Sequence, residues 1–351
     1  MNTRIYKVTP EALPDILTAC RDLLSRGELV AFPTETVYGL GGNGLDQEAA
    51  RKIYEAKGRP SDNPLILHIG KKEMLYPYVT EVPEKAERLM EAFWPGPLTI
   101  ILNKAPSVPY TTSGGLDTIA FRFPSHPVAN ALLKGLEFPV AAPSANLSGR
   151  PSTTRGSHVI EDLDGRIAAI IDDGDVPIGV ESTIVDLTQD PPVLLRPGFI
   201  SLEELKKVVG EVLVDPAVQN QNIISHSQVV DHPKAPGMKY RYYAPKAPVT
   251  IVSGPEDKVA EAIRNRADAS TGILTVDEHV KAYPEGVVLS VGSSKAPETI
   301  IHNLFDVLRR FDETGVHKIY AEDLTKEDST GAVMNRLLKS AGGNFVLWDE
   351  L

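Results

Sequence analysis

The 351-residue sequence predicts an α/β protein of two domains, and three observations point to this fold class. Apolar strand patterns alternate with helical patterns in both halves of the chain. The length also exceeds what a single hydrophobic core normally serves. A polar stretch without periodicity, from about residue 214 to 246, separates the two halves. We therefore expect domains at 1–210 and 247–351, joined by a linker at 211–246.

The first region mixes helices and strands. The helix over 46–58 has Asp46 as a candidate N-cap and Gly58 as its C-cap, which places Lys57 in its last turn. A capping box of Ser201 and Glu204 opens another helix. The expected helices cover residues 15–27, 46–58, 83–93 and 201–210, and the expected strands cover 29–34, 65–69, 98–102, 118–123, 139–144, 167–171 and 182–187.

The second region alternates strands and helices regularly. Strand patterns cover 247–252, 272–276, 286–291 and 318–322, and helical patterns lie near 256–266, 297–313 and 328–340. This βα alternation predicts a small parallel-sheet domain.

Composition restricts the protein to a few broad classes. Apolar residues make up 42% and charged residues 24%, as is usual for soluble globular proteins. The sequence contains no run of 18 apolar residues and no apolar leader at its N-terminus. Cys20, the single cysteine, excludes an intramolecular disulfide and a cysteine-rich metal site. We therefore expect a cytoplasmic protein.

The formal net charge of -11 argues against a surface covered by nucleic-acid-binding charge, although it leaves room for a local cationic cleft. The glycines at 39–44, GLGGNG, formally match the dinucleotide motif G-x-G-x-x-G. They do not follow their strand directly, since residues 35–38 intervene, and Asp62, the nearest acidic candidate, lies in a loop flanked by prolines. A nicotinamide dehydrogenase therefore stays open as a disfavoured alternative. The eight histidines show no metal-ligand spacing.

Small polar residues and cations follow several of the predicted strands. Ligands of open sheets bind at strand ends, in the crevice between loops. Arg59, Arg122 and Arg196 directed into one such crevice would attract phosphate, because guanidinium groups match phosphate and carboxylate oxygens. The segments concerned are PTETVYGLG (33–41), KGRPSDNP (57–64), TIAFRF (118–123), APSANLSGRPS (142–152), GVESTIVD (179–186) and LLRPG (194–198).

Taken together and in chain order with WPGPLT (94–99), these segments resemble the YrdC-like threonylcarbamoyl-AMP synthases over most of residues 13–200. APGMKYRYYAP (235–245) and the following hundred residues are similar to the linker and C-terminal domain of the longer family members. The resemblance implies a YrdC-like twisted open mixed sheet with helices, plus a smaller Rossmann-like parallel α/β domain. Tyr242 and Tyr243 depart from the family pattern, so we assign them no role.

The resemblance implies a nucleotidyltransferase that makes L-threonylcarbamoyl-AMP and pyrophosphate from L-threonine, bicarbonate or CO2, and ATP. Its product would supply the N6-threonylcarbamoyladenosine modification of tRNA, so a downstream threonylcarbamoyl transferase and tRNA are candidate partners. Mg2+ would accompany ATP, and we expect no metal ligands from the protein. A double-stranded RNA or tRNA-binding module without turnover is the alternative, recognisable by steep loss of affinity with salt.

The resemblance also implies roles for particular residues. Lys57, Arg59 and Arg196 would be the catalytic cations, and Arg122 would hold the threonine carboxylate. Tyr240, from the linker, would belong to a lid over the cleft. The implied threonine pocket is Thr36, His68, Arg122, Ala142 and Ser182, and the implied ATP site is Arg59, Asn63, Thr118, Ser144, Asn146, Ser152, Arg196 and Tyr240.

Overall fold

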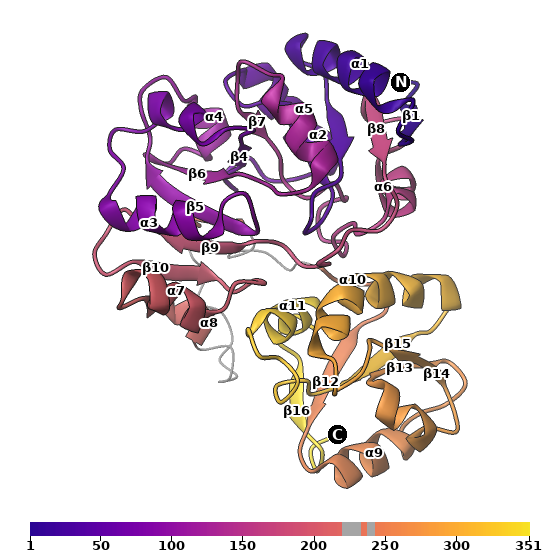
Figure 1. The fold of residues 1–351 in the computed structure, drawn as a ribbon. Coiled ribbons are helices and arrows are strands. Elements are labelled where there is room, and N and C mark those ends of the chain that lie inside the picture. Colours follow the sequence, from indigo (N-terminus) through magenta and orange to yellow (C-terminus); the bar gives the residue numbers. More distant parts are fainter. Residues whose placement is uncertain (220–232, 237–242) are drawn as a thin grey trace.

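The computed structural model describes residues 1–219, 233–236 and 243–351. It shows two α/β domains stacked on one another (Figure 1). The first is built on an eleven-stranded mixed sheet and the second on a five-stranded sheet in which every pairing is parallel. Both observations confirm the predicted fold class.

The strands of the first domain run in the order β1-β8-β2-β3-β7-β4-β6-β5-β9-β10-β11. Parallel and antiparallel pairs alternate irregularly along this sheet. The bounds are β1 (Arg4–Lys7), β2 (Val30–Phe32), β3 (Gly39–Asn43), β4 (Ile66–His68), β5 (Leu98–Asn103), β6 (Thr118–Arg122), β7 (Val140–Ala141), β8 (Ala169–Asp172), β9 (Thr183–Asp186), β10 (Val193–Arg196) and β11 (Leu213–Val214).

Helices cover this sheet, and several have the predicted caps. The Asp46 side chain accepts from the Glu48 amide, and Gly58 ends the same helix with a φ of 62°. Ser201 and Glu204 form the predicted capping box. The helices are α1 (Leu13–Ser25), α2 (Gln47–Lys57), α3 (Glu84–Phe93), α4 (Tyr110–Ser113), α5 (Pro127–Lys134), α6 (Gly156–Leu163), α7 (Leu202–Val209) and α8 (Pro216–Gln219), with 3-10 turns η1 (Lys72–Met74) and η2 (Tyr76–Tyr78).

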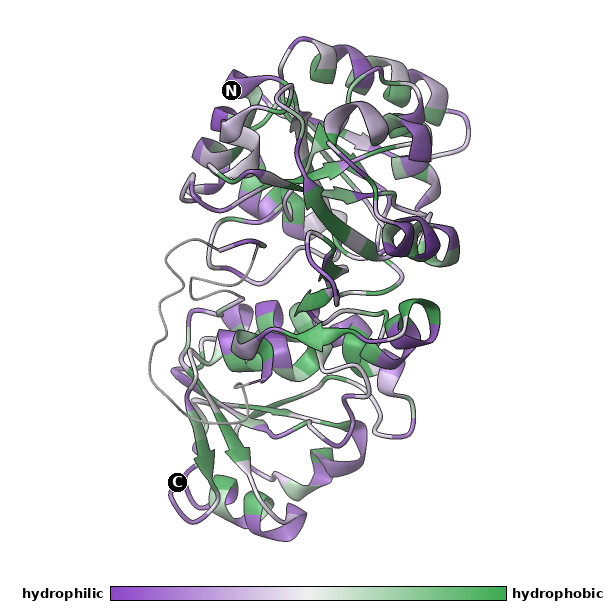
Figure 2. Cartoon of the chain, turned by 90° about the vertical axis from the view of Figure 1, so that its left-hand side faces the viewer, coloured by the Kyte–Doolittle hydropathy of each residue, from purple (hydrophilic) through white to green (hydrophobic). Residues whose placement is uncertain are grey.

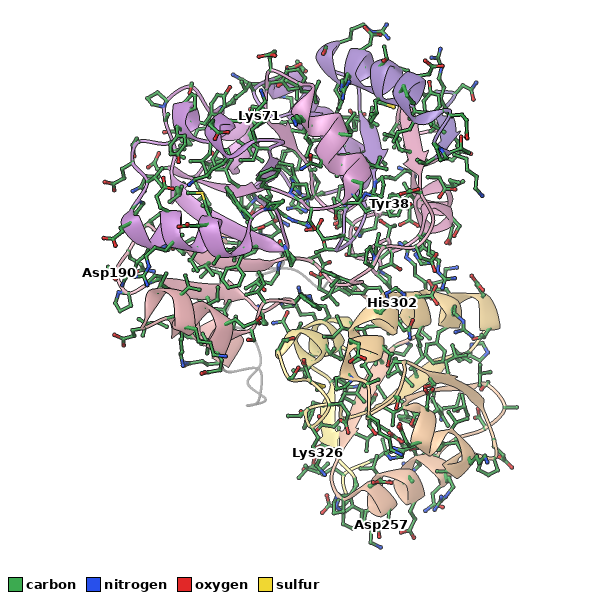
Figure 3. The ribbon with its side chains drawn as sticks, in the orientation of Figure 1. Tyr38, Lys71, Asp190, Asp257, His302 and Lys326 are labelled. Carbon is green, nitrogen blue, oxygen red and sulfur yellow. The ribbon has the colours of Figure 1, made fainter. Side chains whose placement is uncertain are left out.

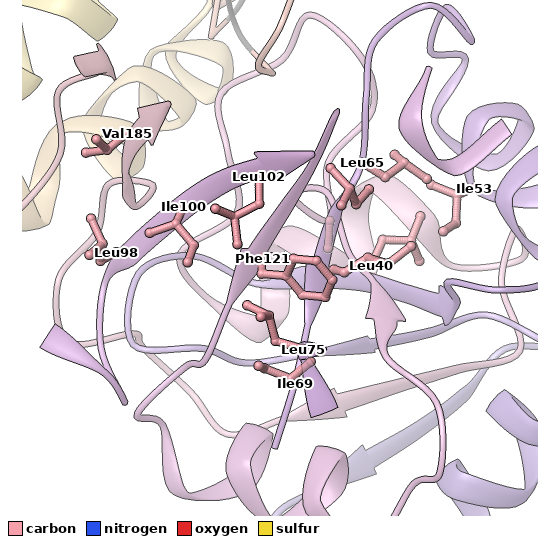
Figure 4. Packing of buried hydrophobic residues seen from close by; sticks show 14 of the residues in the cluster. Leu40, Ile53, Leu65, Ile69, Leu75, Leu98, Ile100, Leu102, Phe121 and Val185 are labelled. Atoms are coloured by element: carbon pink, nitrogen blue, oxygen red, sulfur yellow. The ribbon is translucent and has the colours of Figure 1, made fainter. Parts of the chain in front are cut away.

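The main core of the first domain lies between the central strands and the helices. Phe121 of β6 is fully buried there, with Leu40, Ile69 and Leu102 around its ring (Figure 4). The helices turn apolar residues toward the sheet and polar residues outward (Figure 2). This packing fixes β6 and β4, which carry Arg122 and His68 at their ends.

The second domain has the strand order β14-β13-β15-β12-β16. Its parallel sheet confirms the prediction made from the βα alternation. The elements are β12 (Val249–Ser253), α9 (Glu256–Arg264), β13 (Thr271–Thr275), η4 (Asp277–Ala282), β14 (Val287–Ser290), α10 (Pro297–Thr314), β15 (Lys318–Glu322), α11 (Ala332–Ser340) and β16 (Phe345–Leu347).

Helices α10 and α11 form the side of the second domain that faces the first (Figure 1). Val37 and Val180 of the first domain join the hydrophobic cluster of the second. His302 of α10 lies at this junction (Figure 3), with its Nδ1 atom 3.1 Å from the Pro177 carbonyl oxygen. The domains therefore share a packed interface, reinforced by buried ion pairs.

The structure does not agree with the disfavoured dinucleotide alternative. The GLGGNG segment is not a phosphate loop before a helix, because Gly39–Asn43 forms β3 between β2 and β7. A Cβ at Gly41 would lie 2.8 Å from the Phe32 ring, so this glycine permits close packing, and the dinucleotide interpretation is wrong. Also, β11 pairs with β10, so the start of the predicted linker belongs to the first sheet.

Candidate active site

A cavity opens near the middle of the large sheet, on the side toward the second domain. The space open to the centres of water molecules within it is about 60 Å³, so the cavity is narrow in this structure. Arg59, Arg122 and Arg196 all line it, although they come from three distant segments. The remaining lining residues are Thr34, Val37, Tyr38, Gly39, Lys57, Ile66, His68, Ala142, Pro143, Ser144, Asn146, Ser148, Gly149, Glu181, Ser182, Pro236 and Tyr243.

Arg122 is held at the end of β6 by two neighbours. Its Nη1 donates to the Thr36 hydroxyl at 2.7 Å, and its Nη2 lies 2.7 Å from Glu35 Oε1. Burial alone would raise the pKa of the Glu35 carboxyl, but the Arg122 guanidinium holds that pKa below its usual value. Arg122 Nε is buried and has no hydrogen-bond partner among the described residues. One edge of the guanidinium is thus free for an anionic ligand.

His68 pairs with Arg122 in the parallel register of β4 and β6. Burial and the nearby Arg122 charge lower the pKa of its imidazole to about 3, so it is neutral at physiological pH. Its Nδ1 lies 3.0 Å from the Ile66 carbonyl oxygen, which can only accept a hydrogen bond. The proton therefore sits on Nδ1, and Nε2 is an acceptor.

Arg196 ends β10 and reaches toward the start of β9. Its Nε donates to the Ser182 carbonyl at 3.0 Å, and its Nη2 donates to the Ser182 hydroxyl at 3.2 Å. That hydroxyl also lies 2.7 Å from Thr99 Oγ1. Burial lowers the pKa of Arg196 to about 10, which leaves it charged at neutral pH. The guanidinium is therefore a fixed positive charge on the cavity wall.

Lys57 and Arg59 come from the end of α2 and the loop after it. The Lys57 ammonium donates to the carbonyls of Ser144 and Asn146, and the Ser148 amide donates to the Lys57 carbonyl at 2.9 Å. Burial, with Arg59 nearby, lowers the pKa of Lys57 well below its usual value. Arg59 Nη2 donates to the Pro64 carbonyl at 3.0 Å, which closes the loop between them. Lys57 thus positions residues 144–148 as well as lining the cavity.

Asn146 presents its amide within this loop. Its Nδ2 donates to the Leu147 and Arg150 carbonyls at 2.8 and 3.0 Å. Its Oδ1 is buried and accepts no hydrogen bond from the described residues. Buried acceptors are normally satisfied, so this oxygen is available to a ligand donor.

Most of the residues predicted for the site line the cavity, but four of the described ones do not. Thr36 stands behind Arg122, and Ser152 donates to Glu181. Thr118 is two residues before Ala120, which pairs with Ile66, so Thr118 and Asn63 lie together at the other end of β4 and β6. Tyr240, with the rest of the expected lid over 237–242, is outside the described residues, and that prediction stays open.

Several residues of the site were not predicted. Glu35 and Glu181 are buried carboxylates, each paired with an arginine. Pro236 and Tyr243, on either side of residues 237–242, both line the cavity. Tyr243 packs on Phe305 of α10, with ring centroids 5.0 Å apart. Glu35 directly follows the strand predicted over 29–34, so its position could have indicated a role. Arg336, the partner of Glu181, lies 155 residues away, and no local pattern connects the two.

The protein supplies no metal cage within the described residues. No group of three or more His, Cys, Asp or Glu side chains is placed to hold an ion there. The buried carboxylates Glu35 and Glu181 are both engaged by arginines. In the same residues, no helix has the length and apolar character to span a bilayer.

Comparison with known proteins agrees with this geometry. Residues 22–198 match the Sua5–YciO–YrdC family model, which carries the description telomere recombination, and residues 200–342 match the model of the threonylcarbamoyl-AMP synthase C-terminal domain. The threonylcarbamoyl-AMP synthase of Pyrococcus abyssi is 49% identical over 325 residues, covering 91% of this chain and 92% of that protein. The chain belongs to the threonylcarbamoyl-AMP synthase family.

Other family members agree with this assignment. The threonylcarbamoyl-AMP synthase of Bacillus subtilis is 47% identical and covers 92% of each chain. The structure of Pyrococcus abyssi Sua5 complexed with L-threonine superposes with a TM-score of 0.89 at 46% identity, over 99% of each chain. The family resemblance inferred from the motifs is confirmed. Membership of this enzyme family also decides against a binding module without turnover.

Proposed function

We propose that the cavity binds L-threonine and ATP side by side and joins them through a carbonyl carbon taken from bicarbonate or CO2. One observation carries the proposal: Arg59, Arg122 and Arg196, from three distant segments, line one cavity in a protein of net charge -11. Such clustering concentrates anionic substrates against an unfavourable overall field. The products would be L-threonylcarbamoyl-AMP and pyrophosphate.

The threonine would occupy the part of the cavity between β4 and β6. Arg122 would bind its carboxylate through the unoccupied Nε edge, since Nη1 and Nη2 already have partners. His68 would accept a hydrogen bond from the amine or hydroxyl through Nε2. Ala142 would leave room for the ligand, and Thr36 and Ser182 would orient the arginines. The Pyrococcus abyssi protein was solved as a complex with L-threonine, which supports L-threonine as a ligand.

The nucleotide would lie along the remaining wall. Lys57, Arg59 and Arg196 would face the phosphates, and Ser144 and Asn146 would hydrogen-bond to the nucleotide from the loop that Lys57 supports. Asn63 and Thr118 do not line the cavity, so as ATP contacts they would lie beyond it, toward the start of β4 and β6. Ser152 would not touch the nucleotide but would hold Glu181, which lines the cavity, through its hydroxyl hydrogen bond. Tyr240 would cover the nucleotide from the linker.

The proposed reaction needs charge stabilisation more than proton transfer. Bicarbonate takes up a proton and loses water to give CO2. The threonine amine attacks the CO2 carbon and releases a proton, which leaves a carbamate anion. A carbamate oxygen then attacks the α-phosphorus, and the bond from phosphorus to the pyrophosphate oxygen breaks. The nucleophile is already an anion, so the fixed cations lower the barrier by holding the developing charge. The lack of an unpaired carboxylate base among the described lining residues is consistent with this scheme.

Mg2+ would enter with ATP as part of the substrate, bound by phosphate oxygens. The described residues offer no carboxylate cage, and Mg2+ commonly relies on substrate phosphates and water. The product would pass to a transferase that modifies tRNA, so that enzyme and tRNA are the proposed partners. A cytoplasmic location, where both substrates and tRNA occur, belongs to the same proposal.

An omission experiment tests the proposal. Pyrophosphate release from MgATP is measured with L-threonine and bicarbonate together, with each alone, and with L-serine in place of L-threonine. We expect release above background only when L-threonine and bicarbonate are both present. Release that proceeds equally well without either one would contradict the proposed reaction.

A further inference from the structure

Arg336 of α11 belongs to the second domain, but its side chain is fully buried against the first. Its Nε donates to Glu181 Oε2 at 3.0 Å, and its Nη2 donates to the Glu181 carbonyl at 3.3 Å. Its Nη1 donates to the Pro197 carbonyl. Glu181 immediately precedes Ser182, and Pro197 immediately follows Arg196. Arg336 of the second domain therefore binds the backbone next to Ser182 and next to Arg196, which both line the cavity.

These two segments are themselves in close contact. Arg196 Nε donates to the Ser182 carbonyl at 3.0 Å. A Cβ on Gly198 would lie 2.4 Å from the Thr183 amide nitrogen, so the backbones pack directly on each other. Because interiors this tight transmit small shifts, displacing Pro197 or Glu181 would also turn the Arg196 guanidinium.

Glu181 extends the same connection to the loop of the proposed nucleotide site. Its Oε1 accepts the Ser152 hydroxyl hydrogen, while its Oε2 is bound to Arg336. Burial would raise the pKa of this carboxyl, but Arg336 and Arg196 together hold the pKa below its usual value. Glu181 is thus a charged bridge between Arg336, Arg196 and Ser152.

We propose that Arg336 is a positioning residue of the active site, through which the second domain sets the direction of Arg196. The inference rests on the proposed contact between Arg196 and the ATP phosphates. Arg336 does not line the cavity, so it acts on turnover through the orientation of another cation. Oriented cations help catalysis most when they are fixed before charge develops, and small misplacements cost large factors in rate.

The test compares Arg336→Gln with a matched interface variant, Asp306→Asn. Asp306 of α10 also pairs across the interface, with Arg155 and His158 at 3.3 Å each, but none of these residues lines the cavity. Three quantities are measured for each protein: the melting temperature, the affinity for L-threonine by calorimetry, and kcat and KM for MgATP. Arg336→Lys and the pair Arg336→Gln with Glu181→Gln complete the set.

We expect Arg336→Gln to lower kcat at least tenfold while L-threonine affinity changes less than threefold, because Arg122 is fixed by other neighbours. Asp306→Asn should keep kcat within twofold. The paired variant removes the buried unpaired carboxylate, so it should recover the melting temperature without recovering kcat. If Arg336→Gln alone fails to fold, kcat is measured on the paired variant instead.

Two results would overturn the inference: kcat within twofold of wild type in Arg336→Gln, or recovery of kcat together with stability in the paired variant. Arg336→Lys keeps the positive charge but not the planar guanidinium with its several donors, so we expect its kcat to lie between those of Arg336→Gln and the wild type. Full loss in Arg336→Lys with full activity in Arg336→Gln would also contradict it. Failure of the wild-type protein to make the adduct would instead refute the proposed function, so the two failures are distinguishable.

Discussion

Arg122 Nη2 lies 2.7 Å from Glu35 Oε1, and both side chains are buried at the end of β6. A buried ion pair of this kind is weak evidence for stability, because removing the charges from water costs about as much as their attraction returns. It does, however, fix the direction of the arginine. Thr36 holds a second guanidinium nitrogen, and the Nε edge remains open. The pair therefore prepares a site for one carboxylate.

Arg122→Gln should remove this site. The change deletes the positive charge and leaves Glu35 buried without its partner. Removing one partner of a buried charge pair across a binding interface typically costs about 2–5 kcal/mol. Losing the contact between Arg122 and the threonine carboxylate should therefore lower L-threonine affinity at least about 30-fold. Calorimetric titration measures it, and Arg21→Gln is the matched control, since Arg21 binds the Leu132 and Ala131 carbonyls away from the cavity. Unchanged affinity in Arg122→Gln would exclude the proposed carboxylate contact.

The Glu35 carboxylate should make stability depend on pH in the acid range. Its pKa is lower in the folded protein than its ordinary value of 4.5. The unfolded chain therefore binds the proton more tightly, and the contribution of Glu35 is present above pH 4.5 and is lost as pH falls below it. Urea unfolding at pH 3–6 should show the gap between wild type and Glu35→Gln shrinking toward the acid end. A difference in unfolding free energy that grows toward acid pH would instead mean that folding raises the pKa of Glu35, which would contradict this prediction.

His68 should remain neutral across the physiological range. Its pKa falls from 6.5 to about 3 on folding, so protons bind the unfolded state more tightly between these values. Folding stability should thus rise with pH through this window, by at most about 1.4 kcal/mol per pH unit from this residue. NMR of the imidazole nitrogens should show the Nδ1–H tautomer and no titration from pH 5 to 8. A His68 midpoint near 6.5 would refute the neutral-acceptor role.

Arg59→Ala and Arg196→Ala should each lose most of the turnover while keeping the fold. Removing one preoriented donor from a developing anion commonly costs about 100- to 1,000-fold in kcat. Steady-state pyrophosphate release measures the loss, and thermal unfolding checks the fold. Arg26→Ala is the control, because Arg26 is exposed and pairs only with Asp22 among the described residues. Wild-type rates in both cavity variants would exclude the cationic mechanism.

The sequence predicted those parts of the fold that have local signals. Asp46, Gly58 and Ser201 cap their helices as their residue types require, and the βα alternation after residue 247 gave the parallel sheet. The glycines of β3 are ambiguous in the sequence, because glycine serves both phosphate loops and crowded strands. At Gly41 the reason is the Phe32 ring, which comes close only when β2 and β3 pair.

The candidate site was predictable where cations and small polar residues follow apolar strands. Arg122 and Arg196 end β6 and β10, Arg59 lies in the loop between α2 and β4, and all three line the cavity. The buried network behind them was not predictable, because it depends on which distant segments meet. Arg336 and Glu181 are 155 residues apart and belong to different domains, so no spacing in the sequence connects them. The sequence predicted only that Lys57 faces phosphates. Its second role, binding the carbonyls of Ser144 and Asn146, depends on a contact between distant segments that no local pattern indicates.

The most direct test of the proposed reaction is mass spectrometry of the product formed from MgATP, L-threonine and 13C-labelled bicarbonate. We expect L-threonylcarbamoyl-AMP carrying one labelled carbon, formed in equal amount with pyrophosphate by the wild type and nearly absent with Arg59→Ala or Arg196→Ala. Pyrophosphate without a labelled adduct, or an adduct made equally well by both variants, would contradict it.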